Sequence, residues 1–285
     1  NSDLQFYSDY DEGDFYLYSA EGNPGSRFSD IEIGEGQNIF AGQAQDLVID
    51  NISFMYTGQH AVGLNNSQNV AVTNCIFSWI GGSILSWDRN AKNVVNYGNA
   101  VEVYVSCDGL TVENNWMYQI YDTGITVQYW GGEEVSKQQD IEYKRNLIEY
   151  VHWGIEYVNI TRTGFTKNMH VAYNVFRYGG YGWGSIVRFR ESVSQLYSGN
   201  MCGITQENEN IVAEYNIFGP AKGYVAVIPR NSNEIDNANI YIQKLGGTFA
   251  WVKDETIYST YDAATEVVKY IGDKNAVVVI FEEEN

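Results

Sequence analysis

Residues 110–117 read LTVENNWM, and this stretch is one copy of a pattern that recurs along the chain. Apolar residues alternate with polar ones, an Asn follows, and an apolar or aromatic residue comes shortly after it. The other copies are LVIDNISF at 47–54, VAVTNCIF at 70–77, IEYKRNLI at 141–148, HVAYNVF at 170–176 and IVAEYNIF at 211–218. Successive copies end 23, 40, 31, 28 and 42 residues apart, which is typical of solenoid coils with or without an insertion.

A second strand-like segment, introduced by small residues, also recurs between these copies. The segments are HAVGLNN at 60–66, GNAVEVYVS at 98–106, GITVQYW at 124–130, GIEYVNI at 154–160, GSIVRFR at 184–190 and GYVAVIP at 223–229. We therefore interpret each unit as strand, turn and strand, stacked on the next unit so that all of them share one core. The turn residues predicted to form a ladder of stacked amides are Asn51, Asn74, Asn114, Asn146, Asn174 and Asn216.

The stretch YGNAVEVYVSCDGLTVENNWMYQIYDTGITVQ, residues 97–128, resembles segments of bacterial right-handed parallel β-helix proteins of the pectate-lyase-like superfamily. The resemblance extends over residues 35–245 and implies an all-β fold. This fold is a right-handed parallel β-helix, a single-stranded solenoid, with a C-terminal cap containing a short helix. The resemblance also implies a carbohydrate-active protein that is secreted or lies on the cell surface. It does not imply one reaction, because the architecture hosts lyases, hydrolases, epimerases, esterases and adhesins.

Three regions are predicted. Residues 1–34 hold a hairpin at 4–19 and the segment leading into the solenoid, residues 35–245 form the β-helix, and residues 246–285 form a strand-helix-strand cap. Within the cap we expect a helix over 262–273 that begins with Asp262 as its N-cap and ends at Gly272. The chain begins at Asn1 without a Met, so we interpret it as a mature form or as part of a longer protein.

The composition excludes several classes of partner. Among 285 residues there are 36 Asp and Glu but 17 Lys and Arg, a formal charge of −19, which disfavours nucleic acid and anionic membrane surfaces. No apolar run is long enough for a membrane span. The three Cys and three His do not have metal-ligand spacing, so we expect no cofactor and no metal site. Calcium dependence stays open, and no feature indicates an oligomeric state.

The second segments bring chemically mixed side chains to one outer face. If the segments align, Glu102, Thr126, Glu156 and Arg188 point outward on one sheet at neighbouring heights about 4.8 Å apart. Tyr104, Gln128 and Arg190 come two residues further along the same face. Insertions at 88–97, 131–139, 161–168 and 191–209 follow the same strand of each unit, so they are predicted to wall a groove that suits an extended polymer.

We assign candidate roles on this face for a polysaccharide or glycan substrate. Glu102 and Glu156 are the expected acid and base of glycoside hydrolysis, with Asp122 as a substitute for one of them. The residues expected to bind substrate are Tyr104, Gln128, Trp130, Trp87, Arg188 and Arg190, the two Trp by stacking and the two Arg by orienting it.

Two alternatives stay open. A polysaccharide lyase acting on a uronate-containing polymer would use Arg188 or Arg190 beside the uronate carboxylate. A non-catalytic adhesin or surface-binding module would carry the same outward polar residues simply as solvated side chains. His60 and His152 lie near the expected groove edge, and we interpret them as structural.

Overall fold

The computed structural model describes residues 2–9, 11–88, 93–160, 163–187, 199–205, 207–228, 234–252 and 255–282. It divides the chain into two compact units, residues 1–34 and 35–285. The first unit contains an antiparallel hairpin of β1 (Phe6–Asp9) and β2 (Asp14–Leu17), as predicted, and a single helical turn, α1 (Pro24–Arg27). Arg27 ties this unit together by donating to both carboxylate oxygens of Asp3, at 2.8 and 2.7 Å.

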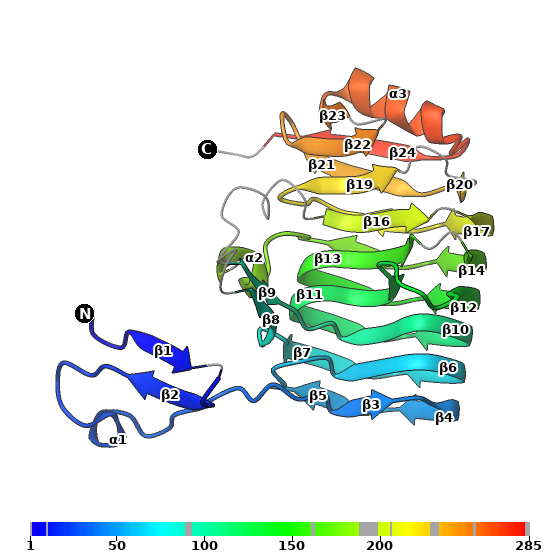
Figure 1. Ribbon diagram of the computed structural model, residues 1–285. Coiled ribbons are helices and arrows are strands. Elements are labelled where there is room, and N and C mark those ends of the chain that lie inside the picture. Colours follow the sequence, from blue (N-terminus) through cyan, green and yellow to red (C-terminus); the bar gives the residue numbers. More distant parts are fainter. Residues whose placement is uncertain are drawn as a thin grey trace. The chain divides into compact units, whose positions relative to one another are not determined.

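The second unit is a stack of coils in which nearly every strand pairs in parallel with the coil below and the coil above (Figure 1). The coil strands are β3 (Phe40–Gly42), β4 (Gln45–Asp50), β5 (Ser53–Met55), β6 (Val62–Thr73), β7 (Ile76–Ile80), β10 (Val101–Glu113), β11 (Trp116–Tyr129), β12 (Lys137–Lys144), β13 (Leu147–Asn159), β14 (Phe165–Ala172), β15 (Val175–Arg177), β16 (Gly199–Thr205), β17 (Asn208–Glu214), β18 (Ile217–Phe218), β19 (Tyr224–Ile228), β20 (Glu234–Asn237), β21 (Ile240–Lys244), β22 (Thr248–Val252) and β24 (Val277–Phe281). Two pairs of strands are antiparallel: β8 (Ile84–Asp88) pairs with β9 (Asn93–Asn96), and β23 (Glu255–Tyr258) pairs with β22.

Each coil has three strands, where the sequence predicted two. The repeated motif around the Asn is itself a strand, a bend and a second strand, and the segment introduced by small residues is the third strand. We call the three sides of the stack face A, face B and face C. Face A includes residues 47–50, 70–73, 110–113, 141–144, 169–172 and 211–214; face B includes 53–55, 76–80, 116–120, 147–151, 175–177 and 217–218; face C includes 40–42, 62–65, 101–104, 125–129, 155–159 and 199–205.

Alternation along the strands sends one set of side chains inward to a continuous core. Aromatic rings stack there from coil to coil, as in Phe54 on Phe77 at 4.8 Å and Phe176 on Phe218 at 5.3 Å between ring centroids. The other set points outward. On face C, outward side chains at matching positions of neighbouring coils therefore lie about 4.8 Å apart.

An amide ladder fills the bend between faces A and B, and the prediction of its members was half right. Asn146, Asn174 and Asn216 belong to it, together with Asn115 and Asn239. Asn51, Asn74 and Asn114 lie one residue earlier, where the backbone is left-handed with φ of 58°, 54° and 57°. Asn suits both positions, because it tolerates the left-handed conformation and can also donate to the next coil, so the sequence did not separate them.

The segment 184–190 was predicted as a face C strand, and this prediction was wrong for residues 184–187, while residues 188–190 lie outside the described part of the chain. Residues Trp183–Val187 form a short helix, α2, and β16 supplies the face C strand above β13. α2 is held at the bend between faces B and C, where the Trp183 indole Nε1 donates to the Gln119 carbonyl at 2.9 Å. Gly184 packs so closely that a Cβ there would lie 2.0 Å from the Tyr121 carbonyl oxygen.

The C-terminal end of the stack is covered by α3 (Tyr261–Ile271), as predicted (Figure 1). Its N-cap is Thr260, whose hydroxyl accepts from the Ala263 N–H, so the prediction of Asp262 as the cap was wrong. Gly272 ends the helix in the left-handed conformation, with φ of 82°. The face of α3 turned to the coils includes the buried residues Ala264, Val267 and Val268.

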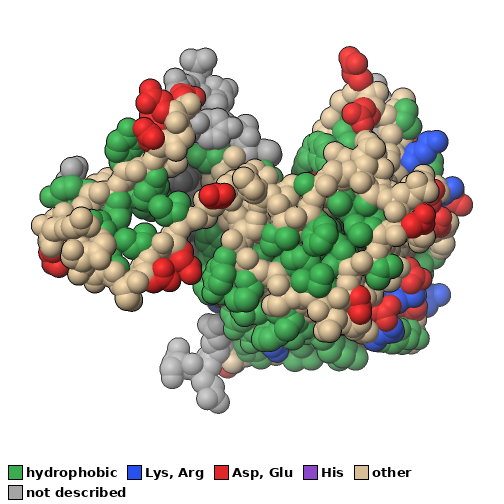
Figure 2. All heavy atoms as spheres, turned by 90° about the horizontal axis from the view of Figure 1, so that it is seen from below, with side chains coloured by type: hydrophobic (Ala, Val, Ile, Leu, Met, Phe, Trp, Pro, Cys, Tyr) green, Lys and Arg blue, Asp and Glu red, His purple; other side chains and the backbone are tan. Residues whose placement is uncertain are grey.

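The opposite end of the stack is formed by β3, β4 and β5. Figure 2 views the protein from this end and shows hydrophobic side chains gathered over it. Val48 is 69% exposed there, and Ile39, Ile52 and Met55 are also exposed. Within the second unit, apolar side chains therefore face solvent at this end of the stack, whereas α3 covers the coils at the C-terminal end.

Candidate functional site

The candidate site lies on the outer side of face C, on the coils that contain β10, β11 and β13. Glu102 pairs in register with Thr126, and Thr126 pairs with Glu156. The residues before them, Val101, Ile125 and Ile155, are all fully buried in the core. Strand alternation therefore turns the column Glu102–Thr126–Glu156 outward, with its two carboxylates two coils apart.

Glu102 is a buried carboxyl group in this column. Three nitrogen atoms converge on one of its oxygens, Oε2. Asn99 Nδ2 donates at 2.5 Å, Gln128 Nε2 donates at 2.9 Å and His60 Nε2 lies 3.4 Å away. Burial raises the pKa of Glu102 to about 7, although the hydrogen bonds from Asn99 and Gln128 oppose this rise.

The orientation of each donor is set by a further contact. The Asn99 Oδ1 accepts from the Thr123 N–H at 2.8 Å, so its amide nitrogen must face Glu102. The Gln128 Oε1 accepts from the Trp130 indole at 2.8 Å, which likewise turns Nε2 to Glu102. These contacts leave Glu102 Oε1 without a hydrogen bond from the described residues, so Oε1 is the oxygen on which the carboxyl proton can sit.

His60 is a member of the cluster that the sequence did not assign to the site. Its Nδ1 accepts from the Asn99 N–H at 3.0 Å, so its proton is on Nε2, the nitrogen nearest Glu102. Burial lowers the pKa of His60 to about 4, which keeps the ring neutral at neutral pH. The repeat pattern gave no signal for this contact, because His60 and Asn99 both lie in bends that precede their face C strands.

Two further acidic residues lie around this cluster. Glu156 accepts from the Thr123 hydroxyl at 2.7 Å. Asp122 acts electrostatically, since its charge raises the pKa of both Glu102 and His60. Between the two glutamates, Thr126 is fully buried, and its hydroxyl has no hydrogen-bond partner among the described residues. A buried hydroxyl without a partner is unusual in a folded protein, and it stands here between two carboxylates.

Aromatic residues border the cluster. Trp130 is 52% exposed, although its indole nitrogen is bonded to Gln128. Tyr104 pairs in register with Gln128 and packs edge-on against Tyr129 at 5.7 Å. The structure therefore brings together Glu102, Tyr104, Gln128 and Trp130. Asp122 lies on the same strand as Gln128, and Glu156 lies on the next coil.

Three predicted binding residues cannot be placed. Arg188 and Arg190 lie outside the described residues, and the strand that was expected to carry them is not formed by 184–187. Trp87 lies on β8, which pairs antiparallel with β9 rather than joining face C. The side chain of Trp87 lies outside the described part of the structure.

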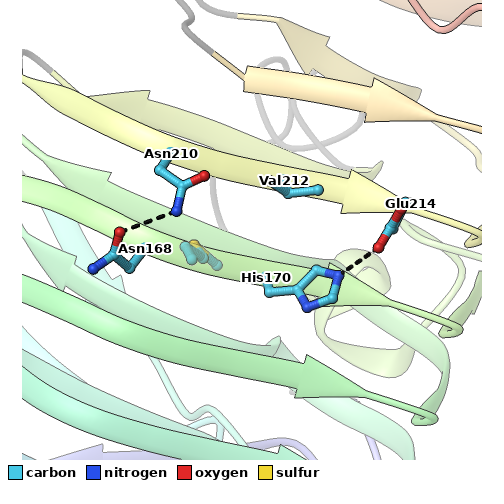
Figure 3. Close-up of a pocket in the computed structure, with 6 residues that line it drawn as sticks. Asn168, His170, Asn210, Val212 and Glu214 are labelled. Atoms are coloured by element: carbon cyan, nitrogen blue, oxygen red, sulfur yellow. Dashed lines mark hydrogen bonds and ion pairs between the residues drawn. The ribbon is translucent and has the colours of Figure 1, made fainter.

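Face A carries a shallow pocket between β14 and β17. Figure 3 shows His170 and Glu214 pointing toward each other across it, with His170 Nε2 2.9 Å from Glu214 Oε1. Asn168 and Asn210 are joined by a 3.0 Å bond at its other side. These side chains bond to one another and remain partly exposed, unlike the buried side chains of the face C cluster.

Within the described ranges no group of three or more His, Cys, Asp or Glu side chains is arranged to hold a metal ion. None of the helices in the described residues has the length and apolar character to cross a lipid bilayer.

Comparison with known proteins agrees with the fold. A family model described as the right-handed β-helix region matches residues 11–139. The comparison with curated proteins found no match, and neither did the comparison with solved structures. A β-helix serves carbohydrate-active and surface-binding proteins alike, so the fold does not select between them. On its strand pairing and this match, the chain is a right-handed parallel β-helix protein.

Proposed function

We propose that this protein is an extracellular carbohydrate-active protein that binds a glycan on face C and cleaves it by glycoside hydrolysis. The observation that supports the proposal is the state of Glu102. A carboxyl group whose pKa is about 7 stays protonated near neutral pH, which a general acid requires. Its three nitrogen neighbours crowd Oε2 and leave Oε1 for the proton.

The acid needs a second carboxylate to complete the reaction. In our mechanism Glu102 protonates the leaving oxygen while Glu156 takes a proton from the attacking water. The two residues are two coils apart, or about 9–10 Å between their backbones, which suits direct attack by a water held between them. Thr126 lies between them in the same column. Asp122 is the alternative base.

The same cluster favours a neutral glycan. The charged side chains that the described residues bring to this part of face C are carboxylates, and the whole chain carries a charge of −19. Both would repel a polyuronate. The half-exposed ring of Trp130 would stack on a sugar ring beside Glu102.

The test is incubation with a panel of neutral and acidic polysaccharides, following both new reducing ends and the ultraviolet absorbance of an unsaturated product. We expect reducing ends without absorbance, and a loss of about 100-fold or more in Glu102→Gln and Glu156→Gln. Glu142→Gln is the matched control, because Glu142 is an exposed face A carboxylate paired with Lys144.

Other outcomes would contradict the proposal in distinct ways. Full activity in both glutamine variants would remove the assigned acid and base. An absorbing product would identify a lyase. Binding without cleavage would identify a non-catalytic surface module.

A further inference from the structure

Face B carries a second set of mixed side chains, away from the face C cluster. Ser78 pairs in register with Tyr118, Tyr118 with Glu149 and Glu149 with Arg177, so they form one column across four coils. Glu149 is 6% exposed, an unusual burial for a carboxylate. A buried carboxylate on the outer side of a sheet needs specific partners.

Both oxygens of Glu149 are occupied. The Trp116 indole Nε1 donates to Oε1 at 3.0 Å, and the Arg177 Nε donates to Oε2 at 2.7 Å. Glu149 thereby holds an aromatic ring and a guanidinium group in fixed positions on one surface. This is the kind of support that a preorganised binding site requires.

The groups that Glu149 holds remain accessible. Trp116 is 41% exposed and stacks on Tyr118 at 4.6 Å between ring centroids. The Arg177 side chain is 43% exposed, and its two Nη groups have no hydrogen-bond partner among the described residues. Ser78 adds a fully buried hydroxyl without a partner in the same column.

We propose that this surface of face B, formed by Trp116, Tyr118, Glu149 and Arg177, is a binding site for a neutral sugar unit of a glycan. The sugar ring stacks on the aromatic pair, and its hydroxyl oxygens accept from the Arg177 Nη groups. The charge balance selects a neutral ligand, because Glu149 cancels the charge of Arg177 and the chain as a whole is strongly negative. The site is independent of the cleavage proposed for face C.

The test is calorimetric titration with cellohexaose, xylohexaose and maltohexaose, and with hexagalacturonate as an acidic probe. It uses the full chain carrying Trp130→Ala to weaken face C. We expect at least one neutral probe to bind, and Arg177→Gln and Trp116→Ala to weaken its binding about tenfold or more. Arg145→Gln is the matched control, because Arg145 is an exposed arginine paired with Glu113 at a different bend, and it should leave binding unchanged within about twofold.

A fold-independent readout guards against an unfolded variant. The Trp116 indole N–H resonance should shift when the neutral probe is added, and Trp116→Phe should keep much of the binding while Trp116→Ala loses it. Unchanged binding in both Arg177→Gln and Trp116→Ala would overturn the proposal. So would binding of hexagalacturonate alone, or no binding of any probe.

Discussion

The bend between faces A and B and the outer side of face C both stack buried polar side chains at the spacing of one coil, yet they treat these groups in opposite ways. In the bend, Asn146 accepts from the Asn115 backbone and donates to both the Val112 carbonyl and the Asn174 amide. On face C, Thr126 has no partner among the described residues, and Glu102 is held in a site that opposes its ionisation.

This difference separates the structural column of the bend from the column on face C that we propose to be functional. Satisfied buried polar groups stabilise a fold, whereas unsatisfied or charge-perturbed groups cost free energy and are kept where they serve another purpose. The four predictions that follow test this contrast, beginning with the largest expected effect.

Removing one ladder amide should be the most destabilising change. Asn146→Ala leaves the buried Asn115 N–H without its acceptor and removes the side-chain bonds to the Val112 carbonyl and to Asn174, so we expect the free energy of unfolding to fall by about 4 kcal/mol. Asn114→Ala is the control, since this exposed residue holds the left-handed bend and makes only exposed side-chain bonds, to Asn74 and Arg145, and it should cost about 1 kcal/mol. Denaturant titration of both variants measures the difference. Equal losses would show that the ladder adds nothing beyond the bend.

Glu102→Gln should change how stability depends on pH. The folded protein keeps the Glu102 proton up to a pKa of about 7, while the unfolded chain loses it near 4.5, so this residue's contribution is present below pH 4.5 and is lost as the pH rises through 7. The variant should therefore match the wild type near pH 4 and exceed it by about 3 kcal/mol above pH 7. Thermal unfolding across this range provides the measurement.

The contribution of His60 runs in the other direction, because its lowered pKa favours the folded state above pH 6.5 and loses that effect as the pH falls through about 4. His60 is present in both proteins, so its effect cancels in the difference between them. A pH-independent difference between Glu102→Gln and the wild type would contradict the raised pKa.

Two fully buried threonines offer a matched pair for the third prediction. Thr166 donates to the Gln138 side chain at 3.1 Å, whereas Thr126 has no partner in the described part of the chain. Thr166→Val should cost about 1–2 kcal/mol, because it leaves Gln138 Oε1 buried without that bond. Thr126→Val should be neutral or stabilise the fold by up to about 1 kcal/mol. Denaturant titration measures both variants. A larger loss of unfolding free energy in Thr126→Val than in Thr166→Val would contradict the view that the Thr126 hydroxyl is unpaired.

The smallest expected effect concerns the left-handed column at the ladder bend. Ala238 has φ of 55° at the position that Asn51, Asn74 and Asn114 fill in other coils. Ala238→Asn should raise the free energy of unfolding by about 0.5 kcal/mol, because Asn tolerates this conformation better than Ala. Ala238→Val, with a β-branched side chain, should lower it. Calorimetric melting temperatures that move in the same direction for both variants would contradict this account.

Much of the fold was predictable from the sequence, because its repeats are short and local. The recurrence of apolar residues and Asn predicted the stacked coils, and the apolar stripe of 264–271 predicted the terminal helix. The count of three strands in each coil was missed, since the left-handed bend inside the motif looks like one continuous strand in the alternating pattern. The segment 184–187 was missed for a different reason, because its place depends on contacts with Gln119 and Tyr121 from an earlier coil.

The candidate site was predictable only in part. Alignment of the face C segments placed Glu102, Thr126 and Glu156 in one column, and the register agrees with this. His60 and Asn99 were not assigned, because their contacts with Glu102 come from bends between strands, where the sequence carries no periodic signal.

The sequence by itself determined the solenoid, the alternation that turns Glu102 outward and the acidic charge that disfavours polyanions. These properties follow from local patterns and composition, which do not depend on long-range contacts. The tertiary structure alone decided that a neutral His60, Asn99 and Gln128 surround one oxygen of Glu102, and that Glu149 holds Trp116 and Arg177 together on face B. The physical reason is that a pKa and a hydrogen-bond network are set by which groups meet across coils. Except for Asn99 and Glu102, these partners are 26 to 42 positions apart in the sequence, and they meet only when the coils stack.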